Sequence, residues 1–167
     1  MLYEFRGICQ HCASEVSITV HNGKLLNACE GCEETPFELT QYKGLVYILK
    51  NENQPGVKIG KTTKTVESRA KQLGASTGVP GKFDIIAIFP TNTPDKDEKK
   101  VHEKLAARKL DKEHFDIEPV EAALQVYRKL NKAREPIFYN ESIKTRFDLE
   151  LEKAKIEMKL RLEGRKK

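Results

Sequence analysis

The sequence predicts an α+β protein built from three parts, and three observations support this prediction. Four cysteines lie in two Cys-x2-Cys pairs near the start of the chain. Apolar residues then alternate over two short segments on either side of a turn, which is the period of β-strands, before helical spacing begins. The last part is rich in Glu, Lys, Arg and Leu, a composition that favours a helix. We therefore expect a cysteine-rich domain over residues 1–42, an α+β domain over residues 43–134 and a charged helical extension over residues 135–167.

The two cysteine pairs are separated by 16 residues and comprise Cys9, Cys12, Cys29 and Cys32. This spacing is typical of a structural zinc site. Each Cys-x2-Cys turn directs two thiolates toward one point, and two turns complete a tetrahedron about 2.3 Å from the metal. We expect these four thiolates to bind Zn²⁺. Disulfide bonds or a redox role are the alternative, although nothing in the sequence indicates secretion. His11 and His21 could each replace a cysteine, but a complete set of four leaves them as solvated loop residues.

The residues between the pairs fit a zinc ribbon. Val16, Ile18 and Val20 alternate as in a half-buried strand, and His21-Asn22-Gly23 supplies a turn into a returning strand at Lys24. A segment of about 40 residues with so few large apolar groups does not fold unaided. Metal binding would therefore supply its folding energy.

Charge divides the chain unevenly. The net charge is +5, but residues 1–43 carry −3 and the remainder +8. This balance permits a polyanionic partner without requiring one. The acidic N-terminal part is therefore not expected to be the main phosphate-binding surface.

No apolar run approaches the roughly 20 residues that cross a bilayer, and the first residues lack the basic-then-apolar order of a signal segment. We expect a cytoplasmic protein with no membrane partner.

Residues 43–134 predict a small three-stranded antiparallel sheet with flanking helices. Apolar alternation over residues 44–49 and 57–61 surrounds a turn, which predicts a β-hairpin. Residues 83–89 read as a third strand, expected at the centre of the sheet. Residues 76–81 and 90–94 read as breaks in regular structure.

Helical spacing predicts four helices. The first has Thr63 or Thr65 as its N-cap and a buried stripe of Val66, Ala70 and Leu73. The second begins at Thr93-Pro94 and aligns Glu98, His102 and Leu105 at i, i+4 and i+7. The third begins near Pro119, with a core face of Val120, Ala123, Leu124, Tyr127 and Leu130. The fourth follows Glu141, with an apolar seam of Phe147, Leu151, Ala154, Met158 and Leu162.

One ordered set of residues resembles the GIY-YIG nuclease superfamily: Gly44-Leu45-Val46-Tyr47, Lys58-Ile59-Gly60 eleven residues after the tyrosine, Arg69 on the next helix and Glu98 on a later one. Further phrases resemble a bacterial and phage branch in which lysine replaces the second tyrosine: Val57-Lys58-Ile59-Gly60-Lys61-Thr62, Glu98-x3-His102 and Glu113-His114-Phe115. The resemblance covers roughly residues 43–130. It implies a metal-dependent endonuclease, and we expect DNA as the substrate.

The resemblance also assigns roles to individual residues. Tyr47 would act as general base or orient the attacking water, and Arg69 would hold a non-bridging phosphate oxygen. Glu98 would carry a single Mg²⁺ or Mn²⁺ ion on the leaving-group side, since one carboxylate suffices when waters and phosphate supply the other ligands. His102 would transfer a second proton or hold Glu98 or the phosphate.

Lys58 departs from the superfamily pattern, and two interpretations follow. Its ammonium group beside Tyr47 would lower the phenol pKa from about 10, which suits a base, and could contact phosphate directly. Alternatively, loss of the second tyrosine marks a non-catalytic module that still binds nucleic acid. A zinc-stabilised protein adaptor is a third interpretation.

Basic residues near the hairpin and first helix are candidate phosphate contacts: Lys58, Lys61, Lys64, Arg69 and Lys71. The zinc ribbon would bind substrate or a partner protein. The apolar seam of the C-terminal helix would dock on the middle domain, pair with a second copy to form a homodimer or bind a partner protein.

Overall fold

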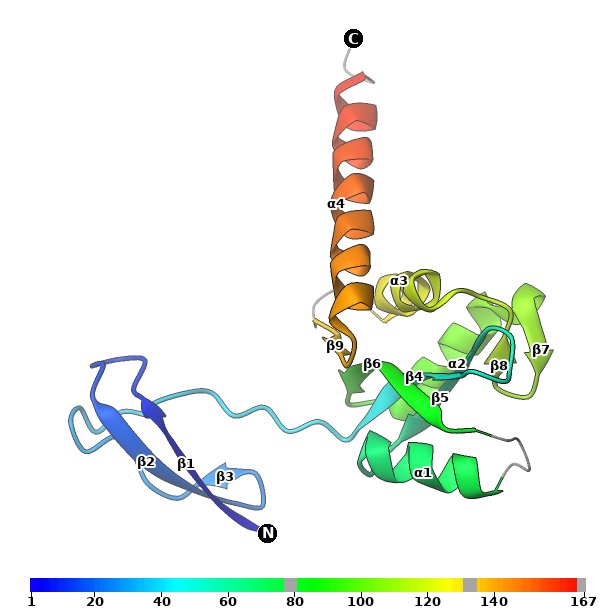
Figure 1. Ribbon diagram of the computed structural model, residues 1–167. Coiled ribbons are helices and arrows are strands. Elements are labelled where there is room, and N and C mark those ends of the chain that lie inside the picture. Colours follow the sequence, from blue (N-terminus) through cyan, green and yellow to red (C-terminus); the bar gives the residue numbers. More distant parts are fainter. Residues whose placement is uncertain (77–80, 131–134, 165–167) are drawn as a thin grey trace. The chain divides into compact units, whose positions relative to one another are not determined.

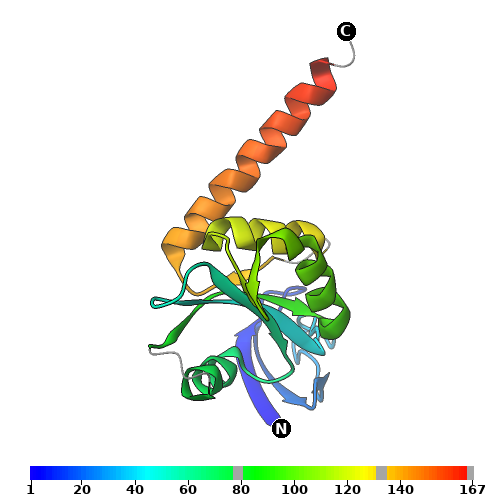
Figure 2. The ribbon, with the colours of Figure 1, turned by 90° about the vertical axis from the view of Figure 1, so that its right-hand side faces the viewer.

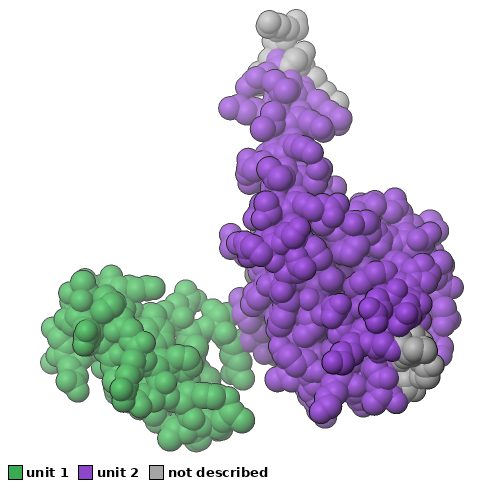
Figure 3. Space-filling view, viewed as in Figure 1, with its two compact units in different colours: residues 1–41 green, residues 42–167 purple. Residues whose placement is uncertain are grey.

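The computed structural model of this chain describes residues 1–76, 81–130 and 135–164. The chain forms two compact units, residues 1–41 and 42–167, which are coloured separately in Figure 3. The described residues form an α+β structure with four α-helices and two antiparallel sheets, as the sequence predicts. The predicted break at residues 76–81 and the end of the predicted C-terminal extension fall largely on residues 77–80 and 165–167, outside the described residues.

The first unit is a three-stranded antiparallel sheet in the order β1-β2-β3. Val16, Ile18 and Val20 are buried as their alternation predicts. Asn22 and Gly23 have φ angles of 50° and 79°, which are the positive values of a two-residue hairpin turn. The strands are β1 (Leu2–Ile8), β2 (Glu15–His21) and β3 (Lys24–Leu25).

Strand β1 is an element that the sequence analysis did not predict. It pairs with β2 along its whole length, from Leu2 opposite His21 to Ile8 opposite Glu15. All seven of its residues are exposed, so its sequence carries no alternation between buried and exposed positions. Backbone hydrogen bonds to β2 hold β1 in place. Such pairing leaves no periodic pattern in the sequence.

The second unit contains a six-stranded sheet in the order β7-β8-β5-β4-β6-β9, and all its pairings are antiparallel. The sequence analysis predicted three of these strands, and three short ones extend the sheet at both ends. The expected central position of residues 83–89 is wrong, because β4 lies between β5 and β6. Strand β6 also continues through Pro90, where a break was expected. The strands are β4 (Gly44–Asn51), β5 (Val57–Thr62), β6 (Phe83–Thr91), β7 (Lys109–Asp111), β8 (His114–Phe115) and β9 (Ile137–Phe138).

Helices cover both faces of this sheet, with α1 on one side and α2 and α3 on the other (Figures 1 and 2). Alternation along β4 explains the two layers. Tyr47 and Leu49 pack with Val66, Ala70 and Leu73 of α1, the stripe that the sequence predicts. Neighbouring β4 residues point to the opposite face, where the larger core lies. The helices are α1 (Val66–Ser76), α2 (Pro94–Lys104), α3 (Pro119–Lys129) and α4 (Glu141–Gly164), with a short 3₁₀ turn at Ala106–Arg108.

Helix α4 begins where Asn140 caps it, since its side-chain oxygen accepts a hydrogen bond from the backbone N–H of Ile143 at 3.1 Å. Phe147 is buried, with its ring 5.5 Å from that of Tyr127 and 4.9 Å from that of Phe138. The first turns of α4 therefore dock on the core of the second unit. Farther along, Met158 is 62% exposed, so the apolar seam continues without cover into a helix that projects from the sheet (Figure 2).

Candidate functional site

Strand β4 places Tyr47 directly across from Gly60 of β5. The Tyr47 side chain is buried. A Cβ atom on Gly60 would lie 2.5 Å from the phenol oxygen and 2.7 Å from Cζ, well inside van der Waals contact. Glycine at this position is therefore what allows the tyrosine ring to lie across β5. This contact gives a physical reason for the glycine of Lys58-Ile59-Gly60.

We expect Gly60→Ala to destabilise the second unit by about 1–3 kcal/mol, which is the usual cost of inserting an extra methyl group into a well-packed core. Thermal unfolding followed by circular dichroism measures this effect. Gly74→Ala is the matched control, because a Cβ on Gly74 approaches only the Gly81 carbonyl oxygen, at 3.8 Å. Alanine is also the better helix former, so this control should hold or raise the midpoint. Equal midpoints for Gly60→Ala and wild type would show that the Tyr47 ring moves freely.

Helix α1 brings Arg69 to the hydroxyl group of Tyr47. The Nε atom of Arg69 donates to that oxygen at 3.4 Å, and Nη1 donates to Gln72 Oε1 at 3.1 Å. The helix is oriented by Thr65, whose hydroxyl accepts from the backbone N–H of Ser68 at 3.4 Å in the manner of an N-cap. The resemblance placed Tyr47 and Arg69 in one site, and the structure places them in contact.

The pKa of Tyr47 moves in the direction opposite to the one expected from Lys58. Burial raises it above its ordinary value, and the hydrogen bond from Arg69 only partly offsets this effect. The negative charges of Glu113 and Glu98 raise the pKa further. Lys58 cannot compensate as the sequence analysis supposed, because its ammonium group is engaged by a carboxylate.

That carboxylate belongs to Glu113. Lys58 is only 7% exposed, and its ammonium group forms an ion pair with Glu113 at the start of β8. Glu113-His114-Phe115 belongs to the residues that carry the resemblance, but the sequence alone assigns no role to Glu113. Its charge acts on both Tyr47 and Arg69, so Glu113 belongs to this cluster of charged groups.

Glu98 reaches the cluster from α2. Its carboxylate lies 3.5 Å from the ammonium group of Lys61, which also pairs with Asp95. The Glu98 side chain is 15% exposed, whereas that of Asp95 is 81% exposed. The charge of Glu98 acts on Tyr47 and Arg69 as well, which places Glu98 within electrostatic range of both. The sequence analysis did not identify Asp95.

Beside Arg69 the surface opens into a cleft of about 590 Å³. Lys61, Lys64 and Arg69, three of the predicted phosphate contacts, line it, whereas Lys71 is exposed elsewhere on α1. Every side chain lining this cleft except Pro94 carries a polar group. The lining residues are Lys61, Thr62, Thr63, Lys64, Ser68, Arg69, Gln72, Pro94 and Asp95.

His102 contacts the backbone of β5. Its Nε2 atom lies 2.9 Å from the carbonyl oxygen of Ile59, which can only accept, so this nitrogen donates. Its ring lies 5.0 Å from that of Phe115. These contacts tie α2, the helix that carries Glu98, to β5.

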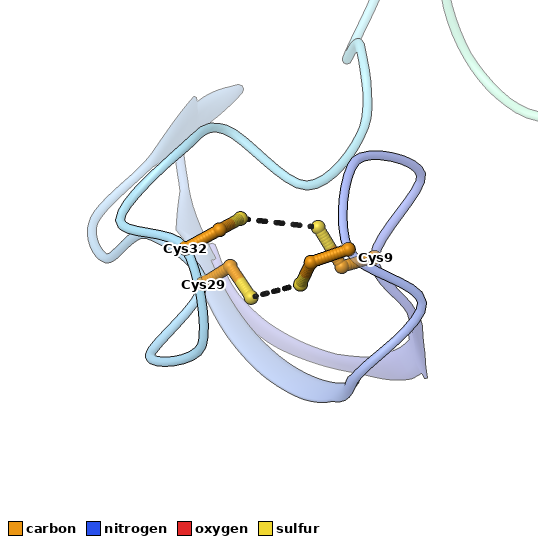
Figure 4. A group of neighbouring side chains, drawn as sticks. Cys9, Cys29 and Cys32 are labelled. Carbon is orange, nitrogen blue, oxygen red and sulfur yellow. Dashed lines mark hydrogen bonds between the residues drawn. The ribbon is translucent and has the colours of Figure 1, made fainter.

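The four cysteines of the first unit converge on one point (Figure 4). The Sγ atoms of Cys9 and Cys32 are 3.7 Å apart, those of Cys12 and Cys29 are 3.6 Å apart, and all four lie within 4.8 Å of one another. A tetrahedral zinc ion with bonds of about 2.3 Å separates its sulfur ligands by about 3.8 Å. The cluster is compatible with zinc, and all four cysteines are free, with no disulfide between them.

Two matching turns build this cluster. In the first, the backbone N–H of Ala13 donates to the Cys9 carbonyl at 3.0 Å, and in the second Glu33 donates to Cys29 at 2.8 Å. Ala13 and Glu33 both adopt positive φ angles, of 58° and 61°. Two equivalent turns with the same unusual backbone conformation indicate a site shaped to direct two pairs of thiols at one ligand.

The thiols also influence one another. Hydrogen bonding with Ser14 lowers the pKa of Cys12 to about 6. Although a backbone hydrogen bond from Glu34 opposes it, burial and the neighbouring thiols raise the pKa of Cys32 to about 12. Four clustered thiols cannot all ionise together unless a cation neutralises them, which is the condition that a metal satisfies.

The second unit is thus an α+β domain in which Arg69 lines an open polar cleft and contacts the buried Tyr47, with the charges of Glu98 and Glu113 acting on both. The family model of the T5orf172 domain matches residues 44–131, more than half of the chain, and the chain belongs to this family. No curated protein and no solved structure matches it.

Within residues 1–76, 81–130 and 135–164, no helix has the length and apolar character needed to cross a membrane.

Proposed function

We propose that the second unit is a metal-dependent endonuclease of the GIY-YIG type that hydrolyses phosphodiester bonds of DNA. The observation that carries this proposal is the contact between Tyr47 and Arg69, of which Arg69 lines the polar cleft and Tyr47 lies within electrostatic range of Glu98. The T5orf172 domain occurs in nuclease-like and DNA-binding proteins, which supports the same class of activity. The excess of basic residues after residue 43 supports a polyanionic substrate.

The residues divide the reaction among them. Arg69 binds a non-bridging oxygen of the phosphate and is drawn away from the Tyr47 hydroxyl as it does so. Tyr47 Oη then orients the attacking water and, in its ionised phenolate form, accepts the proton of that water while the water oxygen forms its bond to phosphorus. The bond to the leaving oxygen breaks on the opposite side of the phosphorus. Lys58, on the same face of the sheet as Tyr47, would add a second positive charge near the phosphate.

Glu98 fits the role of cation ligand. Its carboxylate is mostly buried and already faces one cation, the Lys61 ammonium at 3.5 Å. Carboxylate oxygen is the ligand that Mg²⁺ and Mn²⁺ prefer. Bound there, either ion would stabilise negative charge on the leaving oxygen. Lys61 would then be released to contact phosphate, together with Lys64, while Lys71 contacts the flanking strand.

The first unit is proposed to bind one structural Zn²⁺ through Cys9, Cys12, Cys29 and Cys32. Its acidic charge makes it unsuited to be the main phosphate-binding surface. We propose that it selects or holds the substrate complex through a protein or nucleic-acid contact, while cleavage belongs to the second unit.

Nicking of supercoiled plasmid in Mg²⁺ or Mn²⁺ tests the proposed activity. We expect the wild type to produce open-circular DNA and Glu98→Gln to reduce the rate at least about 100-fold, because the variant loses the carboxylate that holds the cation. Glu103→Gln is the matched control: Glu103 is exposed on the same helix and should be dispensable.

Equal rates for wild type and Glu98→Gln would exclude this metal site. Salt-sensitive DNA binding without nicking in any divalent metal would favour the non-catalytic binding module instead.

A further inference from the structure

A buried ammonium group lies close to the proposed cleavage site. The side chain of Lys58 is 8% exposed and its partner carboxylate, on Glu113, is 34% exposed. Removing an ammonium group from water is costly unless a charged partner compensates. Lys58 could have extended to solvent, as Lys64 does, but its ammonium group is instead held inside by one carboxylate.

The backbone fixes that carboxylate in place. The carbonyl oxygen of Glu113 accepts a hydrogen bond from the backbone N–H of Ile59 at 2.9 Å, which ties the turn before β8 to β5. The preceding residue, Lys112, has a φ angle of 44°, a conformation that residues other than glycine seldom adopt. A tight turn anchored to β5 thus sets Glu113 beside Lys58, rather than leaving the pair to form between two flexible side chains.

The strand register places this pair on the catalytic face of the sheet. Lys58 lies opposite Leu49, and Gly60 lies opposite Tyr47. Side chains two residues apart on a strand point to the same face, so Lys58 shares its face with Tyr47. The negative charge of Glu113 acts on both Tyr47 and Arg69.

We propose that Glu113 is a positioning residue of the cleavage site, which holds the ammonium group of Lys58 on the Tyr47 face of β5, where it meets the phosphate bound by Arg69. This role rests on the proposed nuclease function. Glu113 itself touches neither the phosphate nor the water. It fixes the position of the Lys58 ammonium group, so that loss of Glu113 affects turnover rather than the capture of DNA.

The variant Glu113→Gln tests this role. We expect its nicking turnover to fall about 10- to 100-fold, the usual effect of removing a group that orients a functional side chain. The Kd for a short labelled duplex, measured by fluorescence anisotropy without divalent metal, should stay within about twofold, since exposed lysines dominate non-specific binding. Glu121→Gln is the matched control, because it breaks an exposed ion pair, with Arg108, outside the site.

The double variant Lys58→Met/Glu113→Gln separates positioning from stability. It removes both charges, so the unfolding midpoint should recover relative to Glu113→Gln, because a neutral pair leaves no isolated buried charge. Nicking should remain at the reduced level. A double variant that regains wild-type turnover would show that the pair is purely structural and would overturn the proposal.

Unchanged turnover in Glu113→Gln would also overturn it, provided that the wild type nicks DNA. If the wild type cleaves nothing, both the nuclease function and the positioning role of Glu113 are overturned. Because that result is seen in the wild type alone, it is distinguished from failure of the Glu113 role.

Discussion

Replacing Cys29 with serine should abolish zinc binding and unfold the first unit while the second unit stays folded. The buried core of the first unit comprises Cys9, Val16, Ile18, Val20 and Cys29, so two of its five buried residues are cysteines of the proposed zinc site. Structural zinc contributes about 10–16 kcal/mol in comparable small domains, more than so few apolar residues can supply. Without the fourth thiolate that energy is lost.

Elemental analysis and amide hydrogen exchange measure the two parts of this prediction. Wild type should carry about one zinc per chain, as expected for a four-cysteine site, and Cys29→Ser far less. Exchange should become fast over residues 1–41 in the variant and stay slow in strands β4, β5 and β6. A chelator should reproduce this pattern in the wild type.

The histidine variants His11→Ala and His21→Ala are the matched controls, because both residues are exposed and a complete thiolate set leaves them no ligand role. Both should retain zinc. Protected amides over residues 1–41 in metal-free protein would contradict the prediction, as would loss of zinc in either histidine variant.

The elements that could be predicted from the sequence are those whose signal is local. The stripe of Val66, Ala70 and Leu73 repeats at helical spacing, and the cysteine spacing encodes its own turns. Strands β7, β8 and β9 have only two or three residues, too few for a periodic pattern. Strand β8 pairs with β5, β9 pairs with β6 and β7 pairs with β8, so each becomes a strand only where the folded chain offers it backbone groups to pair with.

The residues of the candidate site also fall into those that have a signal in the sequence and those that have none. Its tyrosine, arginine and Glu98 could be named because the order of motifs resembles a known family. The partner of Lys58 could not, because Glu113 lies 55 residues away and its selection depends on a turn anchored to β5. Burial, followed by the charges of Glu113 and Glu98, raises the Tyr47 pKa, which is the opposite of the effect expected from Lys58. Burial of both side chains, which decides how strongly each charge acts, emerges only when the sheet and α1 are assembled.

Replacement of Tyr47 with phenylalanine should lower plasmid nicking by about 100- to 10,000-fold, the range for removing a general base. Phenylalanine fills the same space across Gly60 and gives up only the 3.4 Å hydrogen bond from Arg69, so the fold should persist. Circular dichroism checks that persistence. Tyr139→Phe is the matched control, because it removes a hydroxyl that bonds Glu67 at 2.6 Å, outside the cleft.

The pH profile gives the sharper test of this tyrosine. Burial holds the Tyr47 pKa above its ordinary value. With the ordinary pKa at about 10, fewer than about one phenol in a thousand is ionised at pH 7. If the phenolate accepts the proton, the rate should rise about tenfold per pH unit between about pH 7 and pH 9, and level off only above the raised pKa. The residual rate of Tyr47→Phe should lack this rise. A rise of equal slope in both proteins would assign the titrating group elsewhere, and a flat wild-type profile would leave Tyr47 the role of orienting water without accepting its proton.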